Sequence, residues 1–221
     1  MYHLDVPDPV LILRENSHPG CGCVVVLGQP RGGTSVVAGF CHLIGVRMGR
    51  EIDPNNMEAK EFLGLSTFDN FHHRFESALA ALKSDTKLFG FKDPTAIDYW
   101  PQISDLVPDP ILIVVLRDAA AIAGRQQHDG GELSNLLANV ASRQYALLRL
   151  GLESDLPTAI VSYERLIQNP SLAFEKLSQF VSGNVSVQIA DKIHETVKPH
   201  ADMPNEINFL KFGARFGLTS P

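Results

Sequence analysis

A glycine-rich stretch at residues 28–35 carries the clearest chemistry in the chain, because its residue types are those that hold a phosphate or a sulfate. It reads GQPRGGTS and lies between a β-branched run and an apolar segment of helical length. Glycines let the backbone curl so that its N–H groups point inward, and the start of a helix adds positive dipole. This order of strand, loop and helix is typical of a phosphate-binding loop. A glycine-rich turn that binds no ligand is the alternative.

The spacing of this loop nearly matches a Walker A motif, G-x4-G-K-[ST]. Gly28 and Gly33 have the required spacing and Ser35 takes the hydroxyl position, but Thr34 stands where the lysine belongs. The cation within the loop is Arg31. Because hydrolysis of ATP or GTP needs the lysine on the β- and γ-phosphates, the loop suits an anion but not an ordinary nucleoside triphosphatase. A P-loop kinase or another nucleotide-binding protein is the rival interpretation.

Polar residues follow each of four predicted strands, at the points where the strands end. The strands, which are rich in β-branched residues, are expected at about 23–28, 87–91, 111–116 and 158–162. The residues at their ends are Gly28, Lys92, Arg117 and Tyr163. In a parallel sheet the carboxyl ends of the strands gather ligands. We therefore expect these residues to lie around one site.

Helical patterns separate the strands, which predicts an α/β fold. The clearest lie at about 33–45, 55–63, 67–82, 133–148 and 186–197. The expected architecture is a three-layer sandwich with a central parallel sheet, like that of the P-loop-containing nucleotide hydrolases. Residues 1–221 are expected to form a single domain, with 1–20 as an N-terminal extension and 205–221 as an ordinary exposed C-terminal tail. Val10 to Leu13 of the extension is predicted to add a short edge strand.

Composition limits the classes of function. The 221 residues are 44% hydrophobic and 20% charged, which allows a sizeable core. The net charge of −6 argues against a nucleic-acid partner. No apolar run approaches the roughly 20 residues of a membrane span. The N-terminus lacks the basic-then-apolar order of a signal peptide, so we expect a cytoplasmic protein with no membrane partner. The three cysteines, Cys21, Cys23 and Cys41, have no metal-site spacing, so no metal is expected.

Four blocks of sequence, in order over about residues 23–182, resemble the sulfotransferase family. The run P-R-G-G-T-S, Pro30 to Ser35, is like the family's 5′-phosphosulfate loop, typically P-[KR]-S-G-T-[TS]. Lys92-Asp93-Pro94 is similar to the K-D-P that follows a middle strand in many bacterial members. The stretch from Val114 to Arg125 is like the family's 3′-phosphate block. The stretch from Val161 to Leu166 resembles its Y-E block.

The chain departs from the family pattern at several of these positions. Gly32 replaces the loop serine, and Arg125 stands where a serine usually helps Arg117 to hold the 3′-phosphate. Ala119 replaces the proline that follows R-[DN], and Pro94 stands where the cytosolic steroid and phenol enzymes carry a histidine. An arginine can hold a phosphate bidentately, so the donor grip can survive in altered form. A different donor, or a binding or assembly subunit that has lost catalysis, is the alternative.

The resemblance implies transfer of a sulfuryl group from 3′-phosphoadenosine 5′-phosphosulfate to a hydroxyl or amine, with no metal required. The implied donor contacts are Pro30, Arg31, Gly32, Gly33, Thr34, Ser35, Arg117, Arg125 and Tyr163. Arg31 would stabilise the leaving phosphate, Lys92 would add a second cation, and Tyr163 would lie near the adenine. In the C-terminal tail, Lys211 and Arg215 are candidates to close over the 3′-phosphate.

The general base and the acceptor are harder to predict. Glu51 lies in a G-x-E context, Gly49-Arg50-Glu51, which resembles the catalytic glutamate of tyrosylprotein-type sulfotransferases. Asp93, His72 and His73 are its competitors. The acceptor is expected to be a small molecule or a glycan, bound by residues 52–84 and by 126–150, and a homodimer is left open.

Overall fold

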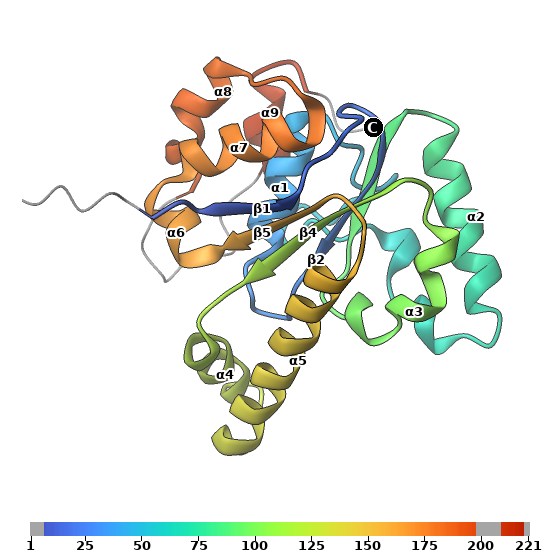
Figure 1. The fold of residues 1–221 in the computed structure, drawn as a ribbon, viewed down its shortest axis with the longest axis vertical. Coiled ribbons are helices and arrows are strands. Elements are labelled where there is room, and N and C mark those ends of the chain that lie inside the picture. The colour runs from blue at the N-terminus through green and yellow to red at the C-terminus, as the bar shows by residue number, and fades with distance from the viewer. Residues whose placement is uncertain (1–6, 198–208, 219–221) are drawn as a thin grey trace, which may run out of the picture.

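The computed structural model describes residues 7–197 and 209–218 and has a five-stranded sheet at its centre (Figure 1). The strand order is β1-β5-β4-β2-β3. The strands are β1 (Val10–Arg14), β2 (Gly22–Leu27), β3 (Leu88–Lys92), β4 (Pro110–Leu116) and β5 (Thr158–Ser162). The last four are parallel to one another, whereas β1 pairs antiparallel with β5. The expected α/β class and central sheet are confirmed, with β1 making the sheet mixed.

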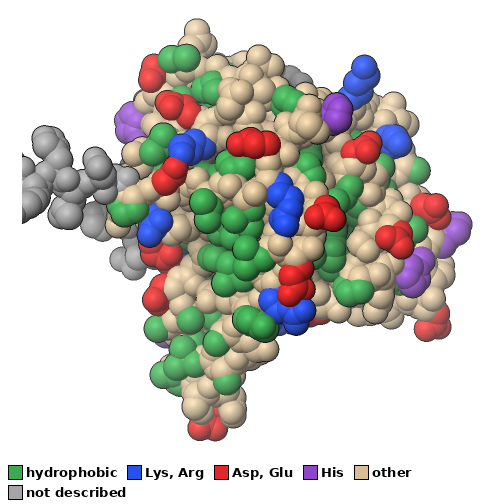
Figure 2. Space-filling view, in the orientation of Figure 1, with side chains coloured by type: hydrophobic (Ala, Val, Ile, Leu, Met, Phe, Trp, Pro, Cys, Tyr) green, Lys and Arg blue, Asp and Glu red, His purple; other side chains and the backbone are tan. Residues whose placement is uncertain are grey.

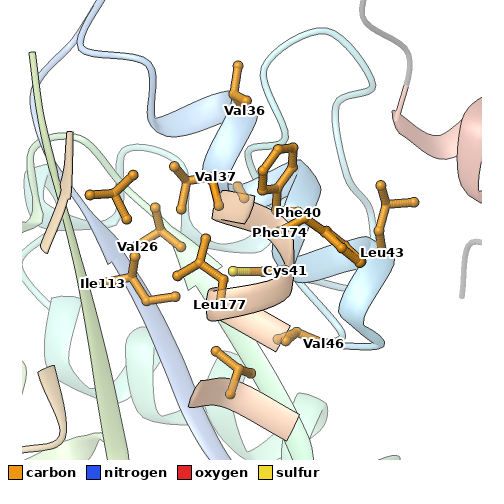
Figure 3. Close-up of a cluster of buried hydrophobic side chains, with 14 of the residues drawn as sticks. Val26, Val36, Val37, Phe40, Cys41, Leu43, Val46, Ile113, Phe174 and Leu177 are labelled. Atoms are coloured by element: carbon orange, nitrogen blue, oxygen red, sulfur yellow. The ribbon is translucent and has the colours of Figure 1, made fainter. Parts of the chain in front are cut away.

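Helices cover both faces of the sheet. One face carries α1 (Thr34–Ile44), α7 (Pro170–Ser182), α8 (Val187–Lys192) and α9 (Phe209–Ala214). The other carries α2 (Phe71–Lys83), α3 (Trp100–Ile103) and α5 (Leu133–Glu153). Each face has its own buried core, as a three-layer sandwich requires. Figure 3 shows the first core, where Phe40 of α1 and Phe174 of α7 meet edge to face at 5.7 Å above Val26 and Ile113.

Two further helices lie at the ends of strands. After β4 the chain enters α4 (Ala119–Gln127), where Asp118 caps the helix by accepting from the N–H of Ala121. Helix α4 packs on the N-terminal half of α5, and the two project beyond the sheet (Figure 1). Helix α6 (Tyr163–Gln168) follows β5 directly. Five short 3₁₀ segments complete the list, at Lys60–Phe62, Leu65–Thr67, Ala96–Asp98, Ser104–Leu106 and Ile193–Glu195. Within the described ranges, no helix is long and apolar enough to cross a membrane.

The predicted edge strand near the N-terminus is confirmed as β1. The carbonyl of Pro9 accepts from the N–H of Ser162, so the backbone groups of the next residue, Val10, face away from β5. The N–H of Val10 is satisfied by the Asp8 carboxylate at 3.0 Å, and that carboxylate also pairs with Lys176. Hydrophobic side chains gather over β1 and β5 on the face shown in Figure 2.

Two sequence predictions were wrong in local structure. The helix expected at 55–63 is instead a loop followed by one 3₁₀ turn, and Met57 is buried there with a φ of 59°. The C-terminal tail expected at 205–221 is not simply exposed, because residues 209–214 form α9, which buries Phe209 and Phe212 against α1. Residues 205–208 and 219–221 of that tail, and 1–6 of the extension, lie outside the described residues.

Candidate functional site

A cavity of about 920 Å³ opens at the carboxyl ends of the four parallel strands. Its walls include Pro30 after β2, Lys92 at the end of β3, Arg117 after β4 and Tyr163 after β5. The structure therefore brings together Lys92, Arg117 and Tyr163, three of the four strand-end residues that the sequence indicated, at the edge where parallel sheets bind ligands, whereas Gly28 is not part of the cavity wall. The volume lies near the top of the roughly 300–1,000 Å³ range of small-molecule sites, which leaves room for a nucleotide beside a second small molecule.

The loop between β2 and α1 has its carbonyl groups engaged from outside. The carbonyl of Pro30 accepts from Nε2 of Gln126 at 3.4 Å, and the carbonyl of Arg31 accepts from Nη1 of Arg117 at 2.8 Å. The N–H of Val36 donates to the carbonyl of Gly33 at 3.1 Å, and the start of α1 at Thr34 carries the positive end of the helix dipole. The loop is thus arranged to receive an anion at the start of α1.

The glycines of the loop are required by close contacts. A Cβ on Gly33, which has a φ of 89°, would lie 2.1 Å from the ring of Tyr163. A Cβ on Gly32 would lie 2.8 Å from the carbonyl oxygen of Gln29, so the usual loop serine does not fit this backbone. The Gln29 side chain is buried and donates from Nε2 to the carbonyl of Val140 at 2.9 Å, which ties the loop to α5. The departure at Gly32 therefore has a packing cause.

The residue in the position of the Walker lysine points inward. Thr34 is 3% exposed, and its Cγ2 methyl occupies the space beside Gly28, where a Cβ would lie 2.4 Å away. Ser35, the next residue, is half-buried and lines the cavity. A long cationic side chain at Thr34 would have to displace this packing. The loop is therefore built around threonine rather than lysine.

Arg31 stands at the mouth of the loop in an unusual conformation. Its φ of 65° lies in the left-handed region, which non-glycine residues seldom adopt and which clusters at functional sites. Its side chain is 55% exposed, and Nη2 lies 3.4 Å from the Asp129 carboxylate. An exposed pair of this kind is worth about 1 kcal/mol or less. An anion bound in the loop can therefore compete for the guanidinium.

Arg117 is held between the loop and α6. Its guanidinium lies over the ring of Tyr163 at 4.6 Å from the centroid and 4.0 Å from the carboxylate of Glu164. Its Nε atom is buried without a hydrogen-bond partner. Burial lowers the pKa of Arg117, and the positive charge of Arg125, which also lines the cavity, acts in the same direction. An anion between the two arginines would relieve both effects.

Lys92 is enclosed by the loop that precedes the first 3₁₀ turn. It is 3% exposed, and its Nζ donates to Glu58 Oε1 at 2.5 Å and to the carbonyl of Asn56 at 3.1 Å. Burial lowers the pKa of Lys92, and the partly compensating charge of Glu58 acts against that shift. Asn56 donates from Nδ2 to the other oxygen of Glu58 at 2.9 Å. Lys92 thus fixes the position of Glu58 in the cavity wall.

The structure does not bring Glu51 to the cavity. Glu51 is exposed and pairs with Lys60 at 3.1 Å. His72 and His73, on exposed positions of α2, also lie outside the cavity wall. Asp93 does line it, but one of its oxygens accepts from the N–H and hydroxyl of Thr95, and the other accepts from the Tyr99 hydroxyl. Glu58 also lines the cavity, and its two oxygens accept from Lys92 and from Asn56.

An apolar slot lies on the α1 side of the cavity. Val36, Ile167 and Phe209 line it together with the Tyr163 ring. Phe209 fits into a notch in α1, because a Cβ on Gly39 would lie 2.2 Å from its ring. A flat apolar group such as a nucleobase suits this slot.

Other predicted positions lie elsewhere. Arg215 lies 3.8 Å from Glu195, and Lys211 is exposed on α9. Neither contributes to the cavity wall, and among the described residues 126–150 contributes no lining side chain, whereas 55–66 contributes many. No group of three or more potential metal ligands occurs in the described part of the chain.

Sequence reasoning missed three important residues. Gln29 and Glu58 carry no motif, and Phe209 belongs to a stretch that resembled a tail. Glu58 could be found only through its pairing with Lys92 at the end of β3, and that pairing is visible only in the folded structure. For Phe209 the clue was an aromatic that recurs three residues later as Phe212.

Comparison with known proteins identifies the fold. The sulfotransferase domain from the curacin biosynthetic pathway has a TM-score of 0.50 and 13% identity over 92% of this chain and 100% of that domain. The sulfotransferase domain from the Synechococcus PCC 7002 olefin synthase has a TM-score of 0.52 and 15% identity over 92% of this chain and 98% of that domain. No protein-family model and no curated protein matches the chain in sequence. The chain therefore has the fold of sulfotransferase domains.

Proposed function

We propose that this protein is a sulfotransferase that moves a sulfuryl group from 3′-phosphoadenosine 5′-phosphosulfate to a hydroxyl or amine of an acceptor. The observation that carries the proposal is the loop at residues 28–35. It combines outward carbonyls, the start of α1, a left-handed Arg31 and a threonine packed in the place of the Walker lysine. Such a loop favours an anion without the group that γ-phosphate hydrolysis needs. The shared fold with sulfotransferase domains supports the same interpretation.

In this proposal the donor nucleotide lies along the loop at residues 28–35, and different residues hold its phosphosulfate, its adenine and its 3′-phosphate. The N–H groups of α1, with Thr34 and Ser35, hold the 5′-phosphosulfate. The slot of Val36, Ile167 and Phe209 takes the adenine beside Tyr163. The 3′-phosphate lies between Arg117 and Arg125, where it pairs with the buried Nε atom of Arg117.

The chemistry is an in-line displacement at sulfur. The acceptor oxygen forms a bond to sulfur as the bond from sulfur to the bridging phosphate oxygen breaks, so negative charge builds on that oxygen. Arg31 and the loop N–H groups stabilise this charge, which is the largest contribution expected in such a site. The products are the sulfated acceptor and 3′-phosphoadenosine 5′-phosphate.

Glu58, in place of Glu51, is proposed to take the proton from the acceptor. Each oxygen of a carboxylate can accept more than one hydrogen bond, so the bonds from Lys92 and Asn56 leave capacity for the acceptor hydroxyl. Lys92 holds the carboxylate in place rather than reaching the sulfuryl group, since its ammonium is buried against the 53–58 loop. Positioning of this kind is what general base catalysis requires.

Calorimetric titration with 3′-phosphoadenosine 5′-phosphate tests the donor site directly. We expect saturable binding that ATP with Mg²⁺ does not match, and weaker binding in Arg117→Met. Tight binding of ATP with Mg²⁺ and none of the bisphosphate would favour the P-loop kinase. Binding of the bisphosphate without sulfate transfer to any acceptor would identify a binding subunit that has lost catalysis.

A further inference from the structure

We propose that the acceptor end of the cavity takes an alcohol with an uncharged, largely apolar body and rejects acceptors that carry a carboxylate, a sulfate or a phosphate. The acceptor end is defined as residues 56–63 together with Lys92, Asp93 and Pro94. The inference rests on the proposed function, because it assumes that an acceptor binds beside the donor loop.

The wall of the acceptor end is apolar and rigid. Ala59, Phe62 and Leu63 line it. Phe62 is 3% exposed and is fixed by stacking on Phe91 at 4.8 Å and by an edge contact with Phe75 at 5.4 Å. Burying the apolar surface of an acceptor against these three side chains stabilises binding by about 25 cal/mol per Å². The same side chains offer no hydrogen bond to a polar acceptor.

The charges at this end do not favour a second anion. Among the described acceptor-end residues that line the cavity, Lys92 is the cation, and its charge is matched by Glu58 at 2.5 Å. Asp93 adds a further negative charge on the same wall. An anionic acceptor would approach two carboxylates and the donor's own negative charges inside the cavity, where like charges repel more strongly than in bulk water.

The polar side chains at this end are bonded within the protein. Asn56 uses both ends of its amide on Glu58, donating from Nδ2 to the carboxylate and accepting from the N–H at 2.9 Å. The hydroxyl of Thr95 donates to Asp93 at 2.8 Å. A glycan needs many protein groups that bond its hydroxyls, and within the acceptor end the side chains of Asn56, Glu58 and Asp93 already have partners in the protein. Asn55 and Ser66 also line the cavity but lie outside this end. The same bonds favour a single hydroxyl directed at Glu58.

Leu63 marks the rim of this end and makes the inference testable. It lines the cavity and is 50% exposed, so a longer charged side chain fits there without disturbing the core. A lysine at this position would supply the cation that the native wall lacks. Leu152, which is 59% exposed on α5 and lies outside the cavity wall, is a matched control position.

The experiment compares four acceptors at saturating donor: benzyl alcohol, 4-(hydroxymethyl)benzoate, 4-(hydroxymethyl)benzylamine and methyl glucoside. For the native protein we expect kcat/KM for benzyl alcohol to exceed that for the benzoate and for the glucoside by at least about tenfold. We expect Leu63→Lys to raise kcat/KM for the benzoate about tenfold and to lower it for the benzylamine. Leu152→Lys should leave all four values unchanged.

The outcomes separate this inference from the proposed function. Equal or better use of the benzoate or of the glucoside by the native protein overturns the acceptor inference and leaves sulfuryl transfer standing. Binding of 3′-phosphoadenosine 5′-phosphate with no transfer to any of the four also overturns it, while the donor site stands. If the native protein does not bind 3′-phosphoadenosine 5′-phosphate, the proposed function is overturned, and the acceptor inference with it.

Discussion

The two ends of the cavity are built in different ways. The end that we propose to hold the donor, here called the donor end, is the short continuous stretch 28–35, whose shape comes from glycines and from carbonyl groups bonded to Arg117 and Gln126. The acceptor end depends on a pair of side chains 34 residues apart, Lys92 and Glu58, which closes the 53–58 loop. The first end depends on glycine positions within one stretch as well as on long-range bonds, and the second depends on a mostly buried ion pair. Removing a cation should therefore lower mainly turnover at Arg31 and mainly stability at Lys92.

The largest effect is expected from Arg31→Ala, at the donor end. Removal of a group that stabilises developing charge typically lowers turnover by about 10² to 10³, and Arg31 is exposed enough that folding should be unaffected. Steady-state kinetics measure the turnover, and urea unfolding measures the stability of the fold. Asp129→Ala is the control, because it breaks the same ion pair but keeps the cation, and it should retain activity. Full activity of Arg31→Ala would remove this residue from the mechanism.

Lys92→Met should mainly lower stability, at the acceptor end. Loss of one partner leaves Glu58 in the wall without its counter-charge, which costs about 2–3 kcal/mol of unfolding free energy when the site is mostly buried. Lys60→Met is the control, since its pair with Glu51 is exposed and should contribute below about 1 kcal/mol. Chemical denaturation of both variants gives the comparison. Similar losses in the two would show that burial does not distinguish these pairs.

Gly33→Ala tests how tightly the donor end is packed. The left-handed backbone alone costs an alanine about 1 kcal/mol, and the clash with Tyr163 adds to it. Gly45→Ala has a similar φ of 98° but open space around its Cβ, so it reports the backbone cost alone. We expect Gly33→Ala to be about 1 kcal/mol less stable than Gly45→Ala and to lose binding of 3′-phosphoadenosine 5′-phosphate. Equal stabilities would mean that Tyr163 moves aside freely.

The smallest effect concerns pH and the helix that completes the donor end. His42 is buried in the last turn of α1, next to Gly213 of α9, and burial lowers its pKa below 6.5. The folded protein then binds a proton less readily than the unfolded chain. Stability should therefore be full above about pH 6.5 and fall on acidification, by at most about 1.4 kcal/mol per pH unit.

The variant His42→Leu isolates this contribution. Urea midpoints at pH 7.5 and 5.5 should differ less in the variant than in the native protein. At pH 7.5 the variant should be no less stable, because Nε2 of His42 makes no hydrogen bond. The same pH slope in both proteins would assign the dependence to other groups.

The sequence predicted the strand, loop and helix around residues 28–35 because their signals are local. Glycine spacing, a β-branched strand and a cap such as Asp118 act within a few residues, so they are legible without the fold. The strand ends at Lys92, Arg117 and Tyr163 were also predictable, since a parallel sheet aligns them. What these residues touch was not predictable, and Arg117 donates to the loop backbone as well as facing the cavity.

The acceptor end resisted prediction for a physical reason. The pattern around Met57 predicted a helix, but the Asp53 carbonyl accepts from the N–H of Met57 and the Asp53 N–H donates to the carbonyl of Glu58. The buried Lys92 also bonds this loop, through Asn56 and Glu58. Tertiary contacts here override local propensity. The same holds for α9, whose six residues form a helix against the notch at Gly39.

The blunted edge of β1 has a consequence for the behaviour of the chain at high concentration. Leu11 is 59% exposed on this strand, and an open apolar edge is a template for the addition of another molecule's strand. A second strand could bond Val10 only by displacing the Asp8 carboxylate and separating it from Lys176. The Asp8 carboxylate therefore obstructs the pairing of a second strand at the start of β1.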